Sequence, residues 1–456
     1  MEHIKSQFRK VIKSENVPEM LKNIPWEFTY ALLFFPLFLM MAMPLWQLFE
    51  DMLVPIGQVN SIHSNISTIN NIALWTGIIS VIIMISKNSV EKPEKTVIFS
   101  TKAPFVFFGA VILFMLISTA VNGITDYVIH GDGYRGESLL VCVMYFVFYF
   151  TSAAAVNTKK RKAILIYAYM ISSIAIAVCA IITSCIHPLE CIKMGTGLSA
   201  IFHHFNHYGY FLLMNIMTSE VLFIKEKNKG LKILSLVSFV INIVVLIIND
   251  TFGCYLACFT ALIFSVIVLS ICEKRFNKLS VLMTVIFVLI SLVMSIWYDT
   301  IFSNLFTFSK DVATITSSSS TEATAKSAGT GRWELWVYTV EFIKEKPLFG
   351  WGLEGTTKQL GELVGHTDRP HNEYLQYAAF FGIPASIAYI CGVFSVFLNG
   401  LKHKYELDIY TITALIASFG YLVSAAFGNT MYYTSPAFFI LLGLAFNTRK
   451  CGEISA

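Results

Sequence analysis

Apolar stretches of about twenty residues recur along almost the whole chain of 456 residues, and they limit what it can fold into. Each stretch is long enough to cross about 30 Å of hydrocarbon as a helix. With 55% hydrophobic and 14% charged residues, such a chain cannot keep its apolar surface out of water by folding alone. Because the stretches lack the alternation of a transmembrane β-strand, we predict an all-α polytopic membrane protein.

The apolar stretches predict about twelve transmembrane helices. The predicted spans are residues 26–46, 69–86, 103–121, 138–156, 164–186, 207–224, 231–249, 251–272, 279–297, 377–399, 408–427 and 434–448. They divide the chain into an N-terminal tail (1–25), spans one to nine (26–297), a long loop (298–376), spans ten to twelve (377–448) and a C-terminal tail (449–456).

The positions of Lys and Arg predict how the chain is oriented in the membrane. Basic clusters at 159–162, 225–232 and 274–278 occupy short loops that all fall on one side. Since short cytoplasmic loops are enriched in these residues, we place these loops and both tails in the cytoplasm and the long loop outside. The first apolar stretch is long enough to remain as an anchor, so we expect no cleavable signal peptide.

The loop of residues 298–376 is far longer than a connection between helices requires. Residues 314–331 are rich in Ser, Thr, Ala and Gly, which is typical of a mobile segment. Apolar residues then recur at helical spacing over 333–343 until Pro347, which predicts an amphipathic helix beside the membrane. We expect the chemistry of the protein in this loop; a surface helix that only covers the bundle is the structural alternative.

Two residues of the loop are suited to reactions of a charged donor. Arg332 begins the predicted helix, where its guanidinium can give two parallel hydrogen bonds to phosphate oxygens or extend toward lipid headgroups. His371, which lies next to Asn372 and close to Arg369, can act as a general base near neutral pH if the cations do not keep it protonated. A single loop histidine also often has only a structural role.

Other polar residues gather at the outer ends of the spans. Arg135 and Glu137 precede span four, where a simple salt bridge would also explain them. Asp250 lies in the turn between spans seven and eight, where turn chemistry alone favours Asn, Asp and Gly. Asn206 and His207 stand at the mouth of span six, and we expect them to bond a polar ligand or a neighbouring loop.

Histidines and cysteines give only weak indications of a metal or a disulfide. His203 and His207 would share one face of a helix, but no third ligand is evident, so no metal or other cofactor is predicted. Cys185 and Cys191 can form a bridge outside span five. The other cysteines lie mostly inside the spans, as small apolar packing residues do.

The ordered motifs of the long loop resemble those of a known family. Residues 331–336 read Gly-Arg-x-x-x-Trp, 347–352 read Pro-Leu-Phe-Gly-x-Gly, and 371–376 read His-Asn-x-Tyr-Leu-Gln, followed by Gly-Ile at 382–383. Weaker matches are Arg-Gly-Glu at 135–137, Asn-His-Tyr-Gly at 206–209 and Asp-Thr-Phe-Gly at 250–253. Together with the helix count, this order resembles the O-antigen ligase and Wzy-polymerase superfamily of bacterial membrane glycosyltransferases over most of the chain.

The resemblance implies an activity and roles for single residues. Members transfer a glycan from an undecaprenyl-pyrophosphate carrier to an acceptor hydroxyl, at the outer face of the cytoplasmic (inner) membrane and without a nucleotide sugar. Arg332 would bind the pyrophosphate, and His371 would be the base of an inverting transfer. The residues expected to support the site are Asn372, Glu137, Asn206, His207, Asp250 and Tyr374. The implied partners are the lipid-linked oligosaccharide, an acceptor glycan, membrane lipid and a flippase or chain-length regulator, with no nucleic acid.

One position departs from the family pattern. Phe252 stands where many ligases carry an Arg that makes a second pyrophosphate contact, so Arg135 or Arg369 is expected to supply it. This departure favours a polymerase of capsular, exopolysaccharide or O-antigen repeat units over a ligase of the same family. A lipid-linked glycan flippase is the alternative from another class, against which stand the lack of an internal repeat and of midplane charges.

Overall fold

The structure is a computed structural model, and it is built almost entirely of helices. It describes residues 6, 17–53, 62–91, 101–131, 136–156, 158–185, 193–194, 197–198, 200–202, 204–297, 300–316, 331–365 and 369–446. Within these ranges the only strands are β1 (Lys193–Met194) and β2 (Gly197–Leu198), which form one small antiparallel pair. The predicted all-α class is confirmed.

The helices follow the predicted spans closely. In the first half of the chain they are α2 (Val17–Asn23), α3 (Trp26–Leu53), α4 (Ile62–Val90), α5 (Ala103–Asn122), α6 (Asp126–His130), α7 (Leu139–Ala155), α8 (Lys159–Cys185), the 3₁₀ turn η2 (Ala200–Phe202) and α9 (Phe205–Lys225). In the second half they are α10 (Lys229–Asn249), α11 (Phe252–Glu273), α12 (Lys278–Met294), α13 (Thr300–Thr316), α15 (Arg332–Glu345), α16 (Thr357–Val364), α17 (Glu373–Phe381), α18 (Ile383–Lys402), α19 (Ile409–Ala425) and α20 (Ser435–Phe446).

Several of these helices can cross a membrane. In the described part of the chain, α3, α5, α8, α10, α11 and α18 are long and apolar enough to do so. The C-terminal part of α4 and helices α7, α12, α19 and α20 are apolar but shorter. A multi-span membrane protein is therefore shown, whereas the number of twelve spans stays a prediction.

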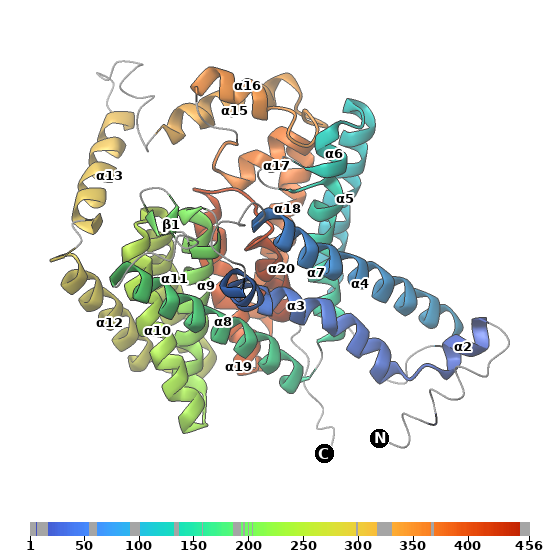
Figure 1. Cartoon of the computed structure of the whole chain (residues 1–456), viewed down its shortest axis with the longest axis horizontal. Coiled ribbons are helices and arrows are strands. Elements are labelled where there is room, and N and C mark those ends of the chain that lie inside the picture. Colours follow the sequence, from blue (N-terminus) through green and yellow to red (C-terminus); the bar gives the residue numbers. More distant parts are fainter. Residues whose placement is uncertain are drawn as a thin grey trace.

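Helices α9 and α20 form the centre of the bundle (Figure 1). Almost every side chain of both is buried, and α9 packs against α10 and α19 while α20 packs against α7 and α19. Helix α9 carries polar groups into this interior, and some of them are paired there: the Glu220 carboxylate accepts a hydrogen bond from the Ser280 hydroxyl at 2.6 Å, and the Ser219 hydroxyl donates to the Ser238 hydroxyl at 2.7 Å. Such hydrogen bonds reduce the free-energy cost of burying polar side chains inside the bundle.

The predicted span ten, 377–399, is divided into the two helices α17 and α18, which meet at Gly382. The chain after α15 docks on this break, where the Ile383 amide donates to the Pro347 carbonyl at 2.8 Å. Gly382 has φ 93°, and a Cβ there would lie 2.1 Å from the Leu348 carbonyl oxygen. Only glycine tolerates both the positive φ and this close approach. The two sequence motifs at 347–352 and 382–383 therefore contact each other through their backbones.

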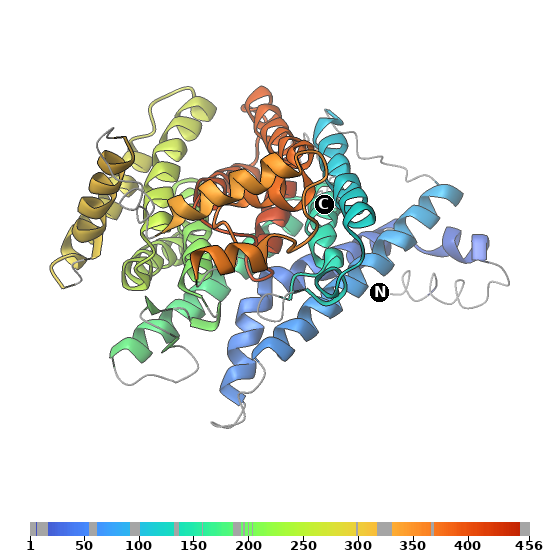
Figure 2. The same cartoon turned by 90° about the horizontal axis from the view of Figure 1, so that it is seen from above.

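The long loop contains more helix than its sequence pattern predicts. Helix α15 is the amphipathic helix expected over 333–343, but α13 and α16 were not predicted. Most of the Ser- and Thr-rich tract, residues 317–330, lies outside the described residues. Helices α15 and α16 lie together at one end of the bundle, next to α17 (Figures 1 and 2). The loop thereby places its polar residues over that end.

Candidate functional site

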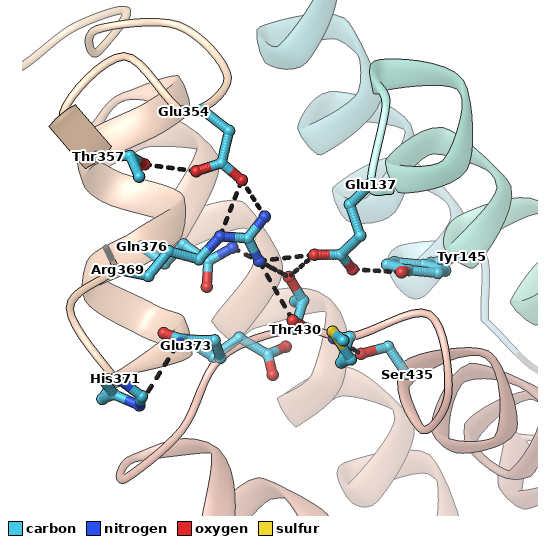
Figure 3. A network of polar contacts seen from close by, with 12 residues as sticks. Glu137, Tyr145, Glu354, Thr357, Arg369, His371, Glu373, Gln376, Thr430 and Ser435 are labelled. Carbon is cyan, nitrogen blue, oxygen red and sulfur yellow. Dashed lines mark hydrogen bonds and ion pairs between the residues drawn. The ribbon is translucent and has the colours of Figure 1, made fainter. Parts of the chain in front are cut away.

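A buried network centred on Arg369 anchors the return of the long loop to the bundle (Figure 3). The Arg369 side chain is 1% exposed. Its Nη1 donates to the Glu137 carboxylate at 2.6 Å, and its Nε donates to the Glu354 carboxylate at 2.8 Å, with a second bond from Nη2 to the same carboxylate. The Thr430 carbonyl accepts a further bond from Nη1 at 3.2 Å. Two carboxylates and one guanidinium thus share a buried site, where each depends on the others for its stability.

The Arg369 network joins distant parts of the chain. Glu137 precedes α7, Glu354 lies between α15 and α16, and Thr430 lies between α19 and α20. Gln376 on α17 also donates to the Thr430 hydroxyl at 2.9 Å. Burial alone would lower the pKa of Arg369, but the two carboxylates raise it well above its ordinary value. The guanidinium therefore stays charged and holds these segments together.

His371 lies two residues beyond this anchor, in an unusual backbone conformation. Its φ is 47°, in the left-handed region that few residues other than glycine adopt. The Trp336 indole of α15 donates to the Pro370 carbonyl at 3.0 Å, and the Asn372 side chain caps α17. The His371 Nδ1 lies 3.4 Å from the side-chain nitrogen of Asn429. The backbone on both sides of the histidine and one atom of its ring are therefore fixed.

A cavity of about 520 Å³ lies beside this return, between the first turns of α11 and α15, one face of α13 and the end of α19. Its walls are Phe252, Gly253, Leu256, Asn304, Thr307, Phe308, Asp311, Val312, Arg332, Trp333, Trp336, Asn372, Ala426 and Phe427. Arg332 is half-buried there, and its guanidinium has no hydrogen-bond or ion-pair partner among the described residues. Phe252 also faces this cavity, so the position at which the family pattern expects an arginine does lie close to Arg332.

The other predicted site residues are spread over this end of the molecule. Arg135 lies outside the described residues. Asp250 accepts a hydrogen bond from Asn304 of α13 at 3.0 Å, and burial raises its pKa. Asn206 and His207 are buried at the start of α9, and neither lines the cavity. Asp250 therefore reaches the cavity only through its bond to α13.

Tyr374 also lies apart from the cavity. Its hydroxyl donates to the Leu422 carbonyl of α19 at 2.7 Å, and its ring lines a separate apolar groove of about 550 Å³ between α11, α18 and α19. This bond attaches α17 to the end of α19. Tyr374 is thus a packing residue of the site's support, and not a residue of the cavity wall.

Sequence reasoning missed a buried carboxylate next to His371. Glu373 is fully buried and accepts hydrogen bonds from the Tyr389 hydroxyl at 2.7 Å and the Tyr421 hydroxyl at 3.0 Å. Burial raises its pKa to about 7 although these bonds act in the opposite direction. Glutamate is common in the first turn of a helix, because its negative charge interacts favourably with the helix dipole. Its presence at this position therefore did not indicate a functional residue.

The histidine pair and the cysteine pair singled out in the sequence fall partly outside the described residues. His203 and Cys191 lie outside the described residues, so neither the histidine pair nor the cysteine bridge can be followed in the structure. Over the described ranges, no group of three His, Cys, Asp or Glu side chains is placed to hold a metal ion.

The fold and the site define a class: a multi-span helical membrane protein with a buried ion-pair network and an arginine-lined cavity under its long loop. Residues 237–390 match the family model of the O-antigen ligase. The predicted resemblance to the O-antigen ligase and Wzy superfamily is thereby confirmed over the segment that contains Arg332, Arg369 and His371. That family indicates processing of glycans at a membrane, of the ligase or polymerase type. Among curated proteins, no sequence matches the chain.

Proposed function

We propose that the protein is an inverting glycosyltransferase that polymerises glycan repeat units carried on undecaprenyl pyrophosphate. The acceptor is the hydroxyl of a second lipid-linked glycan, and the products are capsular, exopolysaccharide or O-antigen chains. The reaction takes place at the outer face of the bacterial cytoplasmic membrane, with both termini in the cytoplasm. It needs no metal or nucleotide sugar, and a flippase and a chain-length regulator act beside it.

The observation that carries this proposal is the position of Arg332. A half-buried guanidinium without a partner among the described residues is poised to bind an anion, and it lies in a cavity otherwise lined mostly by apolar and aromatic groups. A pyrophosphate linked to a lipid and a sugar combines a doubly acidic group with an apolar chain. Asn372 lines the same cavity and follows His371 directly in the chain, which supports a base close to the proposed anion site.

The chemistry follows from these two groups. The His371 imidazole removes the proton of the acceptor hydroxyl as its oxygen forms a bond to the anomeric carbon of the donor sugar. The bond from that carbon to the pyrophosphate oxygen breaks, and the leaving pyrophosphate keeps the electron pair. Arg332 stabilises the negative charge that develops on it. Attack from the side opposite the leaving group inverts the anomeric centre.

The roles of Arg369 and Glu137 in this proposal are structural. The charge of Arg369 is balanced by two buried carboxylates, so direct binding of pyrophosphate would have to displace one of them. We therefore assign the second pyrophosphate contact to Arg135 and give Arg369 the task of holding the loop. Asp250 helps by keeping α13 against the cavity through Asn304.

The proposal is tested by replacing His371 with Asn, which tolerates the same left-handed backbone but is no base near pH 7. Purified wild-type protein should convert lipid-linked oligosaccharide into longer lipid-linked chains. His371→Asn should lose about 10²- to 10⁴-fold in rate, as expected for a general base, while its melting temperature stays unchanged. The exposed His130 on α6 offers the matched control, His130→Asn, which should remain fully active. An active His371→Asn protein would overturn the assignment.

A ligase of the same family is the second candidate, because the matched family model is itself that of the O-antigen ligase. The same assay separates the two activities by their products. Longer lipid-linked chains show polymerisation, whereas transfer only to a different acceptor glycan shows ligation. A flippase would move the lipid-linked glycan across vesicle membranes without making any glycosidic bond, and its transport would not depend on His371.

A further inference from the structure

The segment between α19 and α20, residues 426–434, forms a second wall of the site that lies outside the matched family segment. Its Phe427 lines the cavity, its Thr430 belongs to the Arg369 network, and its Asn429 faces His371. In the sequence this segment was only the connection between two predicted spans. We propose that Asn429 is a positioning residue that orients the His371 ring and sets which of its nitrogens acts as the base; this inference rests on the proposed function.

The backbone on both sides of Asn429 is fixed. Thr430 accepts bonds from Arg369 and Gln376, and its hydroxyl lies 3.2 Å from the Glu137 carboxylate. On the other side, a Cβ at Gly428 would lie 1.2 Å from the Tyr210 hydroxyl, so this position accepts only glycine. The place of the Asn429 side chain is therefore determined by the bundle and not by the loop that carries His371.

The Asn429 side chain has the chemistry to orient an imidazole. It is 2% exposed, and its amide lies 3.4 Å from the His371 Nδ1. Turning the amide by half a revolution exchanges its oxygen and nitrogen within the same space. The buried amide oxygen has no hydrogen-bond partner in the described part of the chain. When this oxygen faces Nδ1, it accepts the Nδ1 hydrogen.

This orientation decides the role of the ring. With its proton on Nδ1, the neutral imidazole carries its lone pair on Nε2, so Nε2 is the atom that takes the proton from the hydroxyl of the acceptor glycan. An asparagine serves a catalytic histidine in the same way in papain-like proteases, on an unrelated fold. The Trp336 bond to Pro370 and the Asn372 cap act on the backbone beside His371, whereas the Asn429 amide meets the ring itself at Nδ1.

Charged groups near His371 are engaged elsewhere in the described structure. Arg369 is paired with Glu137 and Glu354, and Glu373 is bonded to Tyr389 and Tyr421. These groups are identical in the wild type and in a variant of residue 429. A difference in pH dependence between the two proteins therefore reports on residue 429.

The experiment compares Asn429→Ala and Asn429→Asp with the wild type in the chain-elongation assay. Asn429→Ala should lower kcat about tenfold with little change in KM, because one hydrogen bond that orients the base is lost. Asn429→Asp should move the acidic limb of the pH–rate profile up by about one unit or more, since a carboxylate beside the ring favours its protonated form. An asparagine that supports the fold without facing the catalytic ring would not give this shift.

The matched control is Asn399→Ala, a buried asparagine of α18 that donates to the Phe446 carbonyl at 3.4 Å far from the loop. It should change the melting temperature as much as Asn429→Ala without moving kcat. An unchanged pH profile in Asn429→Asp, together with an inactive His371→Asn, would overturn the role of Asn429 and leave the proposed function intact. A wild type that forms no glycosidic bond would instead overturn the proposed function.

Discussion

Arg332 and Arg369 belong to the same long loop, yet they meet opposite surroundings. Arg369 is buried between two carboxylates and a backbone carbonyl, and its charge is fully used. Arg332 is half-buried in a cavity, without a partner for its guanidinium among the described residues. Arg369 therefore holds the loop against the bundle, whereas Arg332 remains available to a ligand.

The comparison extends to the neighbours of each arginine. The Arg369 side is a buried set of polar groups, in which Glu354 comes from the same loop and Glu137 and Thr430 come from distant parts of the chain. The Arg332 side is open and mostly aromatic, and its wall α13 is tied to the turn before α11 through the Asp250–Asn304 bond. A binding site of this kind needs the rigid network as well as the open cavity. The arginine that binds the anion must be held in place by rigid surrounding structure.

The largest expected effect is on the Arg369 side. Arg369→Met would leave Glu137 and Glu354 buried without a cation, which costs about 3–5 kcal/mol of stability. The purified variant should melt at a clearly lower temperature, as followed by tryptophan fluorescence in detergent. Arg332→Met is the control and should melt like the wild type. A stable Arg369→Met protein that merely binds donor weakly would show that Arg369 is a ligand residue, and the comparison would fail.

A second prediction concerns pH and the buried Glu373. In the folded protein its pKa is about 7, whereas its ordinary value is 4.5. The folded state therefore holds a proton that the unfolded state releases, so the free energy of unfolding falls by about 3 kcal/mol as pH rises from 4.5 to 7. Glu373→Gln should reduce the fall in melting temperature across this range, while the exposed Glu341→Gln should leave that fall unchanged. An equally steep pH dependence in Glu373→Gln would assign it to another group.

The Arg332 side should respond in activity and not in stability. Arg332→Gln should lower kcat/KM for the lipid-linked donor about 10- to 100-fold, because a hydrogen bond to a charged group contributes about 1.5–3 kcal/mol. Arg332→Lys should recover part of this loss, since it keeps the charge but not the two parallel donors. Melting temperatures of both variants should match the wild type. Unaltered donor kinetics in Arg332→Gln would remove the cavity from the mechanism.

Sequence patterns predicted the features that depend on residues close together in the chain, namely the apolar helices and the motifs of the long loop. Hydropathy located most of the apolar helices to within a few residues, although α3 and α4 extend well beyond their predicted spans and α13 and α16 were missed, and the motifs singled out Arg332 and His371. The pairing of Arg369 with Glu137 joins residues more than two hundred positions apart, and two predicted spans separate His371 from Asn429 in the sequence. Such contacts leave no periodic trace in a single sequence. The break at Gly382 was missed for the same reason, because it exists only where another backbone approaches.

The smallest expected effect lies where the two sides meet, at the Trp336 indole. Trp336→Phe keeps an aromatic ring on the cavity wall but removes the hydrogen bond to the Pro370 carbonyl, which contributes about 1 kcal/mol. Because this bond positions the residue before His371, we expect kcat to fall about fivefold. Trp351→Phe is the matched control: it removes an equivalent indole bond, to the Phe342 carbonyl at 2.8 Å, away from the histidine. If both variants lowered kcat equally, the lower rate would reflect a general loosening of the loop. The proposed effect of the Trp336–Pro370 bond on His371 would then be wrong.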